Sequence, residues 1–287
     1  MQRVLKWLGV VLGLGALAGI GYGVWRSQQP PSPLLSEQEL AEQLKQLIAA
    51  NDLRVRPVSV VTTVGQGAAP LADQLNICRS QPDQNCGAAY NLLRPGEARD
   101  ERLKAAAWQS SLTYGVDAVT FATGVIAVGR STMVTLAGDR VGMTCLLAHE
   151  LAHHAQDHSF RHSVSSAGWK QLPEAEAQKR SLALSRQQEL EADRWMLQYA
   201  GRAGVSPERC VRSIDALHRS DGDGTPTDPL ATHPGYQERM ENLQRELARI
   251  DPLKLKAEGQ ANLRRGSTLT LGYSPDLQLW TIWQPQE

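Results

Sequence analysis

Apolar side chains recur at helical spacing along much of the chain, and this pattern predicts a mainly helical fold. Leu40, Leu44 and Leu47 share one face of a helix that Ser36 opens and that runs to about Ala50. The same analysis predicts further helices at residues 99–112, 139–157, 173–200, 207–219 and 236–250.

Three segments have the composition or the alternation of β-strands instead. Residues 53–64 are rich in β-branched side chains, residues 117–133 favour a hairpin or a pair of short strands, and residues 266–283 favour a hairpin around "SPD". We therefore expect an α+β fold that is mainly α. It should have a small sheet or hairpin beside the helix at 139–157 and a β-hairpin near the C-terminus.

The first 26 residues differ from the rest of the chain. Arg3 and Lys6 precede nineteen uncharged, mostly apolar residues, from Trp7 to Trp25. As a helix this run would be roughly 28 Å long, which is close to the apolar thickness of a bilayer. Residues 1–26 are therefore predicted to be a transmembrane anchor or a signal peptide, and residues 27–35 a proline-rich linker.

The charges around this segment predict the location of the remaining chain. The basic side chains come first, so the N-terminus is expected in the cytoplasm and everything downstream outside it. Ala16 and Ala18 have the small-residue pattern of a signal-peptidase site, so cleavage is an alternative to anchoring. We expect a periplasmic domain on a single-pass membrane anchor, or a secreted or periplasmic domain after cleavage.

Overall charge argues against nucleic acid as a partner. The 287 residues include 30 basic and 30 acidic side chains, so no long-range field of one sign attracts a polyanion. The hydrophobic content of 41% is enough for a buried core.

The four cysteines form an even set in a chain that is predicted to be exported. Cys78 and Cys86 bracket a turn-rich stretch inside the irregular insertion at residues 65–98, and we expect a disulfide between them. Cys145 and Cys210 lie in predicted helices. For these two, a bridge and a pair of small buried thiols both remain open.

Candidate chemistry is concentrated in "LLAHELAHHAQDH", residues 146–158. His149 and His153 are four residues apart on the predicted helix, hence within about 40° of each other and one turn apart, so both rings can reach one metal ion. Glu150 lies about 100° around the helix, where it can accept a proton from water at that ion. The competing interpretation is a polar helix that is rich in histidine by accident.

A catalytic zinc ion also needs a third protein ligand. His158 and His162 are the nearest candidates in sequence. His154 and His158 should face a different side from the ligand pair, which favours either a solvated side chain or a contact behind a metal ligand for each of them. Glu189 and Asp193, in "RQQELEADRWML", share one helical face, so that one acid can bind the ion while the other accepts a ring N–H from a ligating histidine. The alternative is a solvated acidic face together with neighbouring arginines.

These motifs resemble a known family. "HELAH" at 149–153 followed by "ELEAD" at 189–193 is similar to the HtpX-like and CAAX-prenyl-endopeptidase family of zinc metallopeptidases, a gluzincin group whose later signature is Glu-x-x-Ala-Asp. The similarity covers roughly residues 100–250. It implies a zincin-type metallopeptidase domain.

The resemblance assigns roles within the site. It implies one Zn²⁺ per chain, bound by His149, His153 and Glu189. It also implies that Glu150 is the catalytic base and that Asp193 orients one of the ligating histidines.

Two other segments extend the resemblance. "ATHPGYQERMENL" is similar to the family's His-Pro segment, which makes His233 a candidate to contact the substrate carbonyl or oxyanion. Residues 116–133 resemble the segment before the histidine helix, although Asp117 stands where asparagine is usual. After Arg26 no apolar run approaches twenty residues, so single-anchor or periplasmic relatives, which are associated with protein quality control, are the better comparison.

The expected organisation is a zinc metallopeptidase domain at residues 36–251 and a C-terminal hairpin extension at 252–287. The expected function is zinc-dependent endopeptidase cleavage of unfolded or misfolded extracytoplasmic proteins. A strand edge at the residues following Gly124 would bind extended substrate through backbone hydrogen bonds. That edge comprises Val125, Ile126, Ala127 and Val128.

Two rival functions share the same zinc site. One is a membrane-tethered, chaperone-like binding protein with little turnover, in which His158 or His233 fills the open zinc position. The other is a zinc hydrolase that acts on a non-peptide bond. The sequence leaves the oligomeric state and the natural substrate undefined.

Overall fold

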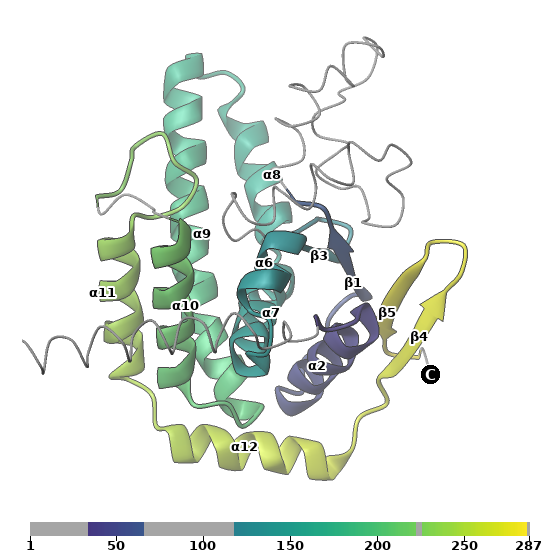
Figure 1. Ribbon diagram of the computed structural model, residues 1–287. Helices are drawn as coiled ribbons and strands as arrows, with labels where there is room; N and C mark the ends of the chain where they lie inside the picture. Colours follow the sequence, from purple (N-terminus) through teal and green to yellow (C-terminus); the bar gives the residue numbers. More distant parts are fainter. Residues whose placement is uncertain (1–33, 66–117, 222–225, 286–287) are drawn as a thin grey trace, which may run out of the picture. The chain divides into compact units, whose positions relative to one another are not determined.

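Helix α7 lies at the centre of the fold. In the computed structural model, which describes residues 34–65, 118–221 and 226–285, α7 spans Arg140–Ala155 and packs against α2 (Glu37–Ala50), α9 (Glu174–Arg202) and α10 (Pro207–Asp221). Figure 1 shows α7 between α9 and α10 on one side and α2 with the sheet on the other. Because α7 is covered on most sides, its polar side chains must find partners inside the protein.

Local sequence explains where these helices begin. Ser36 and Glu39 form a capping box at α2, and the Asp139 side chain accepts a hydrogen bond from the Gly142 N–H at 2.9 Å at the start of α7. Pro173 precedes α9, where its fixed backbone favours the first turn of a helix. These starts agree with the predicted helices to within one residue.

Five strands form a mixed sheet in the order β2-β3-β1-β5-β4. The strands are β1 (Val58–Thr63), β2 (Ala118–Thr120), β3 (Val125–Gly129), β4 (Thr270–Ser274) and β5 (Leu279–Trp283). β1 runs parallel to β3 and antiparallel to β5, while β2–β3 and β4–β5 are hairpins. The fold is α+β and mainly helical, as the sequence predicts.

The C-terminal hairpin belongs to the main sheet. Val58 of β1 pairs with Ile282 of β5, and Ile282 is buried in the core. Residues 34–287 form one unit, so the structure does not separate an extension at 252–287 from a domain at 36–251. The pairing of this hairpin with a strand more than two hundred residues earlier was not predicted, because it does not follow from a local pattern.

Three helices were not predicted: α6 (Arg130–Thr135), α8 (His158–Trp169) and α12 (Pro252–Arg265). α12 follows an Asp251 cap and packs so closely on the end of α9 that a Cβ on Gly259 would lie 1.8 Å from the carbonyl oxygen of Arg202. Only glycine permits that approach. The last helix of the bundle, α11 (Tyr236–Leu247), ends three residues before the predicted limit.

Several predictions concern residues outside the described ranges. They are the membrane anchor or signal peptide at 1–26, most of the linker at 27–35, the Cys78–Cys86 disulfide and the helix at 99–112. No helix within the described ranges is both long and apolar enough to cross a membrane.

A disulfide between Cys145 and Cys210 joins α7 to α10. Of the two alternatives that the sequence left open, a bridge or a pair of buried thiols, the structure shows the bridge. The two cysteines are 65 positions apart, and in the chain-entropy account a loop of that length stabilises the native state by about 4 kcal/mol.

We therefore expect the double variant Cys145→Ala, Cys210→Ala to lose about 4 kcal/mol of unfolding free energy in urea titrations without reductant. The loss arises because the unfolded chain regains the freedom that the bridge removes. Single variants serve as controls and should lose a similar amount. An unchanged urea midpoint in the double variant would contradict a structural bridge.

Candidate metal centre

Two imidazoles on successive turns of α7 converge on one point. The Nε2 atoms of His149 and His153 are 3.2 Å apart, and the two rings meet edge to face. His149 is buried and His153 is partly buried. Helix geometry alone brings i and i+4 side chains together, so this contact follows directly from the sequence spacing.

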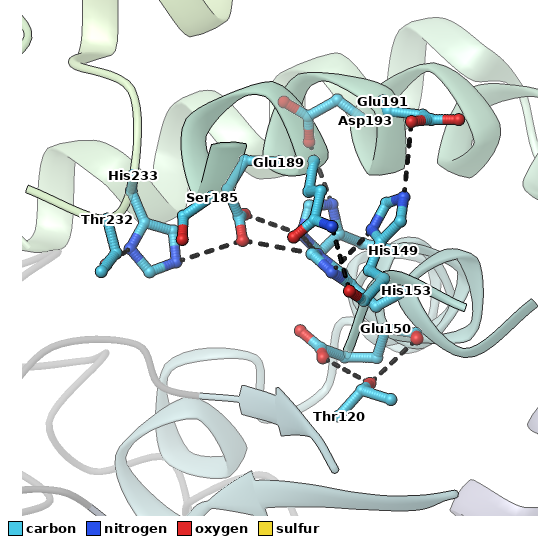
Figure 2. A network of polar contacts seen from close by, with 12 residues as sticks. Thr120, His149, Glu150, His153, Ser185, Glu189, Glu191, Asp193, Thr232 and His233 are labelled. Carbon is cyan, nitrogen blue, oxygen red and sulfur yellow. Dashed lines mark hydrogen bonds and ion pairs between the residues drawn. The ribbon is translucent and has the colours of Figure 1, made fainter. Parts of the chain in front are cut away.

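Glu189 of α9 completes a triangle with these rings. Its Oε2 lies 3.2 Å from His149 Nε2, and its Oε1 lies 3.5 Å from His153 Nε2. One ligand atom from each residue can be chosen so that all lie within 4.8 Å of one another. In Figure 2, Glu189 descends from α9 toward the two histidines of α7.

This triangle fits a zinc ion in size and chemistry. At zinc–ligand distances of roughly 2.0–2.2 Å, the ligand atoms of a tetrahedral site lie about 3.4 Å apart. The contacts of 3.2 to 3.5 Å among His149, His153 and Glu189 match that spacing. Two imidazole nitrogens and a carboxylate oxygen are also the donor set of known catalytic zinc sites, which leave a fourth position open.

Electrostatics favour positive charge at the same point. Burial lowers the pKa of His149, but Asp193 and Glu189 outweigh it and raise that pKa to about 10. Burial raises the pKa of Glu189, yet the two histidines hold it well below its usual range. His153 has its pKa lowered to about 4 by burial and is neutral. The site therefore stabilises a cation between carboxylate and imidazole.

Asp193 contacts the outer nitrogen of the first histidine. Its Oδ1 lies 3.0 Å from His149 Nδ1, which leaves His149 Nε2 facing the triangle. Arg239 of α11 donates two hydrogen bonds to this carboxylate, each of 2.8 Å, and a third of 3.0 Å to His218. Burial raises the pKa of Asp193, but Arg239 and His149 outweigh it and lower that pKa to about 2. Asp193 is thus a buried anion held between an arginine and a histidine.

The outer nitrogen of the second histidine has a different partner. His158, at the start of α8, lies with its Nδ1 3.0 Å from His153 Nδ1 and is 2% exposed. Burial and the neighbouring His153 lower the pKa of His158 to about 4. His154 faces another side of α7 and meets the carbonyl oxygen of Arg56 at 3.1 Å.

Glu150 is buried beside a cavity of about 430 Å³ that His149, His153 and Glu189 also line. The Thr120 hydroxyl lies 2.8 Å from Glu150 Oε2 and 2.9 Å from the Glu150 carbonyl oxygen, so it can donate to either. Figure 2 shows this pair on the opposite side of the histidines from α9. Burial raises the pKa of Glu150.

His233 reaches the same cavity from the loop before α11. Its Nε2 lies 3.6 Å from Glu189 Oε1, its Nδ1 lies 3.0 Å from the Thr232 hydroxyl, and its side chain is 59% exposed. Figure 2 places it on the far side of Glu189 from the α7 histidines. All of the candidate ligand, base and His233 positions are therefore brought together around one cavity.

The expected substrate strand is not where the sequence analysis put it. Val125, Ile126, Ala127 and Val128 lie in β3, which is paired with β1 on one side and with β2 on the other, so they offer no free edge. Within the described ranges β2 and β4 are the edge strands, and the three residues of β2 line the cavity. The prediction was wrong because strand order depends on β1, which is distant in sequence.

Comparison with known proteins concerns the site residues that follow α7 in the chain. Residues 163–247 match the model of Peptidase family M48, whose members depend on a metal ion that is typically zinc. The match supports a metallopeptidase. It includes Glu189, Asp193 and His233 and stops short of α7. Searches of curated proteins and of solved structures found no match.

The sequence analysis missed two residues of the site. Arg239 lies four positions before the buried Leu243 on α11, so an arginine on an otherwise apolar face was the available signal. The role of Thr120 could not be predicted from its place in a short strand, because its contact with Glu150 joins two elements that are separate in the sequence.

We expect Arg239→Met to lower the free energy of unfolding by about 3–5 kcal/mol, because it leaves the buried Asp193 without its cationic partner. Urea unfolding followed by circular dichroism measures the difference. Arg245→Met is the matched control: Arg245 lies on the same helix, is 57% exposed and pairs only loosely with Glu241, at 4.0 Å. The control should lose less than about 1 kcal/mol. Equal losses would contradict a structural role for the Asp193–Arg239 pair.

Proposed function

We propose that this protein is a zinc-dependent metalloendopeptidase that cleaves unfolded or misfolded proteins. The observation that carries the proposal is the convergence of His149, His153 and Glu189 at zinc-ligand spacing, beside the buried carboxylate of Glu150. The match of residues 163–247 to Peptidase family M48 supports the same reaction class independently of α7.

Each polar group around the cavity has a task in peptide hydrolysis. Zinc, when bound, would be held by His149, His153 and Glu189 and would supply a Lewis acid for the water and the scissile carbonyl. Glu150 accepts the proton of the attacking water and passes it to the leaving amine. Its raised pKa suits this exchange, because a base whose pKa lies nearer the operating pH can also return the proton.

Substrate would bind along β2. Ala118, Val119 and Thr120 line the cavity, and an extended peptide that pairs with this strand gains affinity through its backbone. Such pairing selects little by side chain and requires an extended chain, which favours unfolded clients. His233, which lines the same cavity, is the candidate donor to the developing oxyanion.

The biological setting proposed here is extracytoplasmic protein quality control. The support is the N-terminal sequence, in which two basic side chains precede nineteen uncharged residues, and the resemblance to single-anchor or periplasmic relatives. Protein or peptide substrates and a membrane contact through the N-terminal segment are the partners this setting implies.

A second candidate is a zinc-containing binding protein with little turnover. The observation that favours it is the position of His233, whose Nε2 lies only 3.6 Å from a Glu189 oxygen and so is near enough to compete for an open coordination position. His158 is a poor competitor, because its Nδ1 meets the outer nitrogen of His153.

Glu150→Gln is expected to reduce cleavage of unfolded casein by at least about 100-fold while zinc content stays near one per chain, because the amide cannot take up the proton. Fluorescent peptide release and elemental analysis of the full chain measure both properties. Glu176→Gln is the control, an exposed carboxylate on α9 that is paired with Arg180, and it should cleave normally. Equal rates in wild type and Glu150→Gln would leave only the binding function.

Glu189→Ala is expected to lose stoichiometric zinc, because two imidazoles alone leave the ion without its anionic ligand. Elemental analysis after dialysis against a weak chelator gives the result, with Glu176→Ala treated in parallel. A variant that keeps one zinc per chain would remove Glu189 from the ligand set.

A further inference from the structure

The turn between α7 and α8 brings His158, which is not one of the proposed ligands, against the metal centre. Asp157 adopts a left-handed conformation with φ of 53°, and its carboxylate accepts a hydrogen bond of 2.8 Å from Arg56. The chain direction changes there, and His158, the next residue, lies beside His153 with ring centroids 4.8 Å apart and planes at 86°. Gln188 of α9 holds the carbonyl oxygen of His158 at 3.0 Å.

The contact between these rings constrains where their protons lie. His153 directs Nε2 toward Glu189 and His149, so a metal ligand there needs its lone pair on Nε2 and its proton on Nδ1. That N–H then donates to His158 Nδ1 at 3.0 Å. His158 must carry its own proton on Nε2, which lies 3.6 Å from Glu191 Oε2.

The carboxylate of Glu191 is in turn held by arginines. Arg161 of α8 donates to its Oε2 at 3.0 Å, and Arg194 lies 3.9 Å from its Oε1. Glu191 thus presents an anchored negative oxygen to His158, which favours the tautomer with the proton on Nε2. Hydrogen bonds join Arg161 to Glu191 and His158 to His153, and between these two pairs the link is an ion-pair contact of 3.6 Å from Glu191 to His158 Nε2, which has no hydrogen-bond partner among the described residues.

We propose that His158 is a positioning residue that fixes the tautomer and orientation of the zinc ligand His153, and that Glu191 fixes His158 in turn. This role rests on the proposed zinc function. It gives His153 a partner at its outer nitrogen, as Asp193 is the partner at the outer nitrogen of His149. At 2% exposed, His158 cannot act as a solvated side chain. Its Nδ1 is turned to the outer nitrogen of His153, so it is no candidate for the zinc position either.

The two ligating histidines are supported by groups of different charge. His149 has an aspartate at its outer nitrogen, and that anion needs the buried Arg239 to balance it. His153 has a neutral acceptor at its outer nitrogen instead, and the anion behind that acceptor, Glu191, is one side chain further away. His158 therefore orients a ligand without adding a second negative charge next to Glu189 in a buried site.

The test is the zinc affinity of the full chain, measured by competition with a chromophoric chelator. His158→Phe keeps an aromatic ring but offers no acceptor, and it should weaken zinc binding by about 10- to 100-fold. His158→Gln retains an oxygen acceptor and should recover most of that loss. His154→Phe is the matched control, since His154 is also buried but faces another side of α7, where it contacts the carbonyl oxygen of Arg56 rather than a metal ligand. It should bind zinc within about threefold of wild type.

Nitrogen-15 imidazole spectra of the zinc-loaded wild type provide a second measurement that does not depend on any variant folding. The expected pattern is a proton on Nδ1 of His153 and on Nε2 of His158. The opposite tautomer of His158, or equal zinc affinity in His158→Phe and wild type, would overturn the positioning role and leave the peptidase proposal standing. A wild-type chain that binds no zinc would instead overturn the proposed function.

Discussion

The packing of α7 against α9 is the contact on which the site depends. α7 supplies two imidazoles and a carboxylate, and α9 supplies Glu189 and Asp193, so neither helix holds a ligand set alone. Both helices also carry side chains of the hydrophobic core, such as Leu147 and Met196. Apolar burial brings the helices together, and the polar residues between them are then desolvated and must satisfy one another.

Polar groups in this interface contact one another in two chains that start at the outer nitrogens of the ligating histidines. One passes through Asp193 to Arg239, and the other through His158 toward Glu191. Each ends on an arginine, so the carboxylates of Asp193 and Glu191 each have a cation beside them. The metal centre can therefore hold a divalent ion with few carboxylates around it that lack a cationic partner.

Sequence periodicity predicted the parts of this site that lie within single helices. His149 and His153, like Glu189 and Asp193, share a face because of helical geometry, which is fixed by spacing alone. The contact of Arg239 with Asp193 could not be predicted in the same way, because it depends on which faces of α9 and α11 meet.

Less of the sheet than of the helices could be predicted from the sequence. The hairpin around residues 118–129 was predicted because it is local, but the assignment of its second strand as an open edge was wrong. Two partners from elsewhere in the chain decide strand order: β1 beside β3, and β5 beside β1. Similarly, α12 buries only Leu255 and Gly259, so its apolar pattern was too weak to detect, although the Asp251–Pro252 start was a usable signal.

The place of β5 in the sheet has a consequence for biosynthesis. Val60 pairs with Trp280, so the central strand β1 stays unpaired on one side until a segment more than two hundred positions later has been synthesised. Contacts of such long sequence separation form slowly and expose strand edges in the meantime. Completion of the sheet thus waits for the segment that forms β5, and a nascent chain that still lacks this segment lacks the finished sheet.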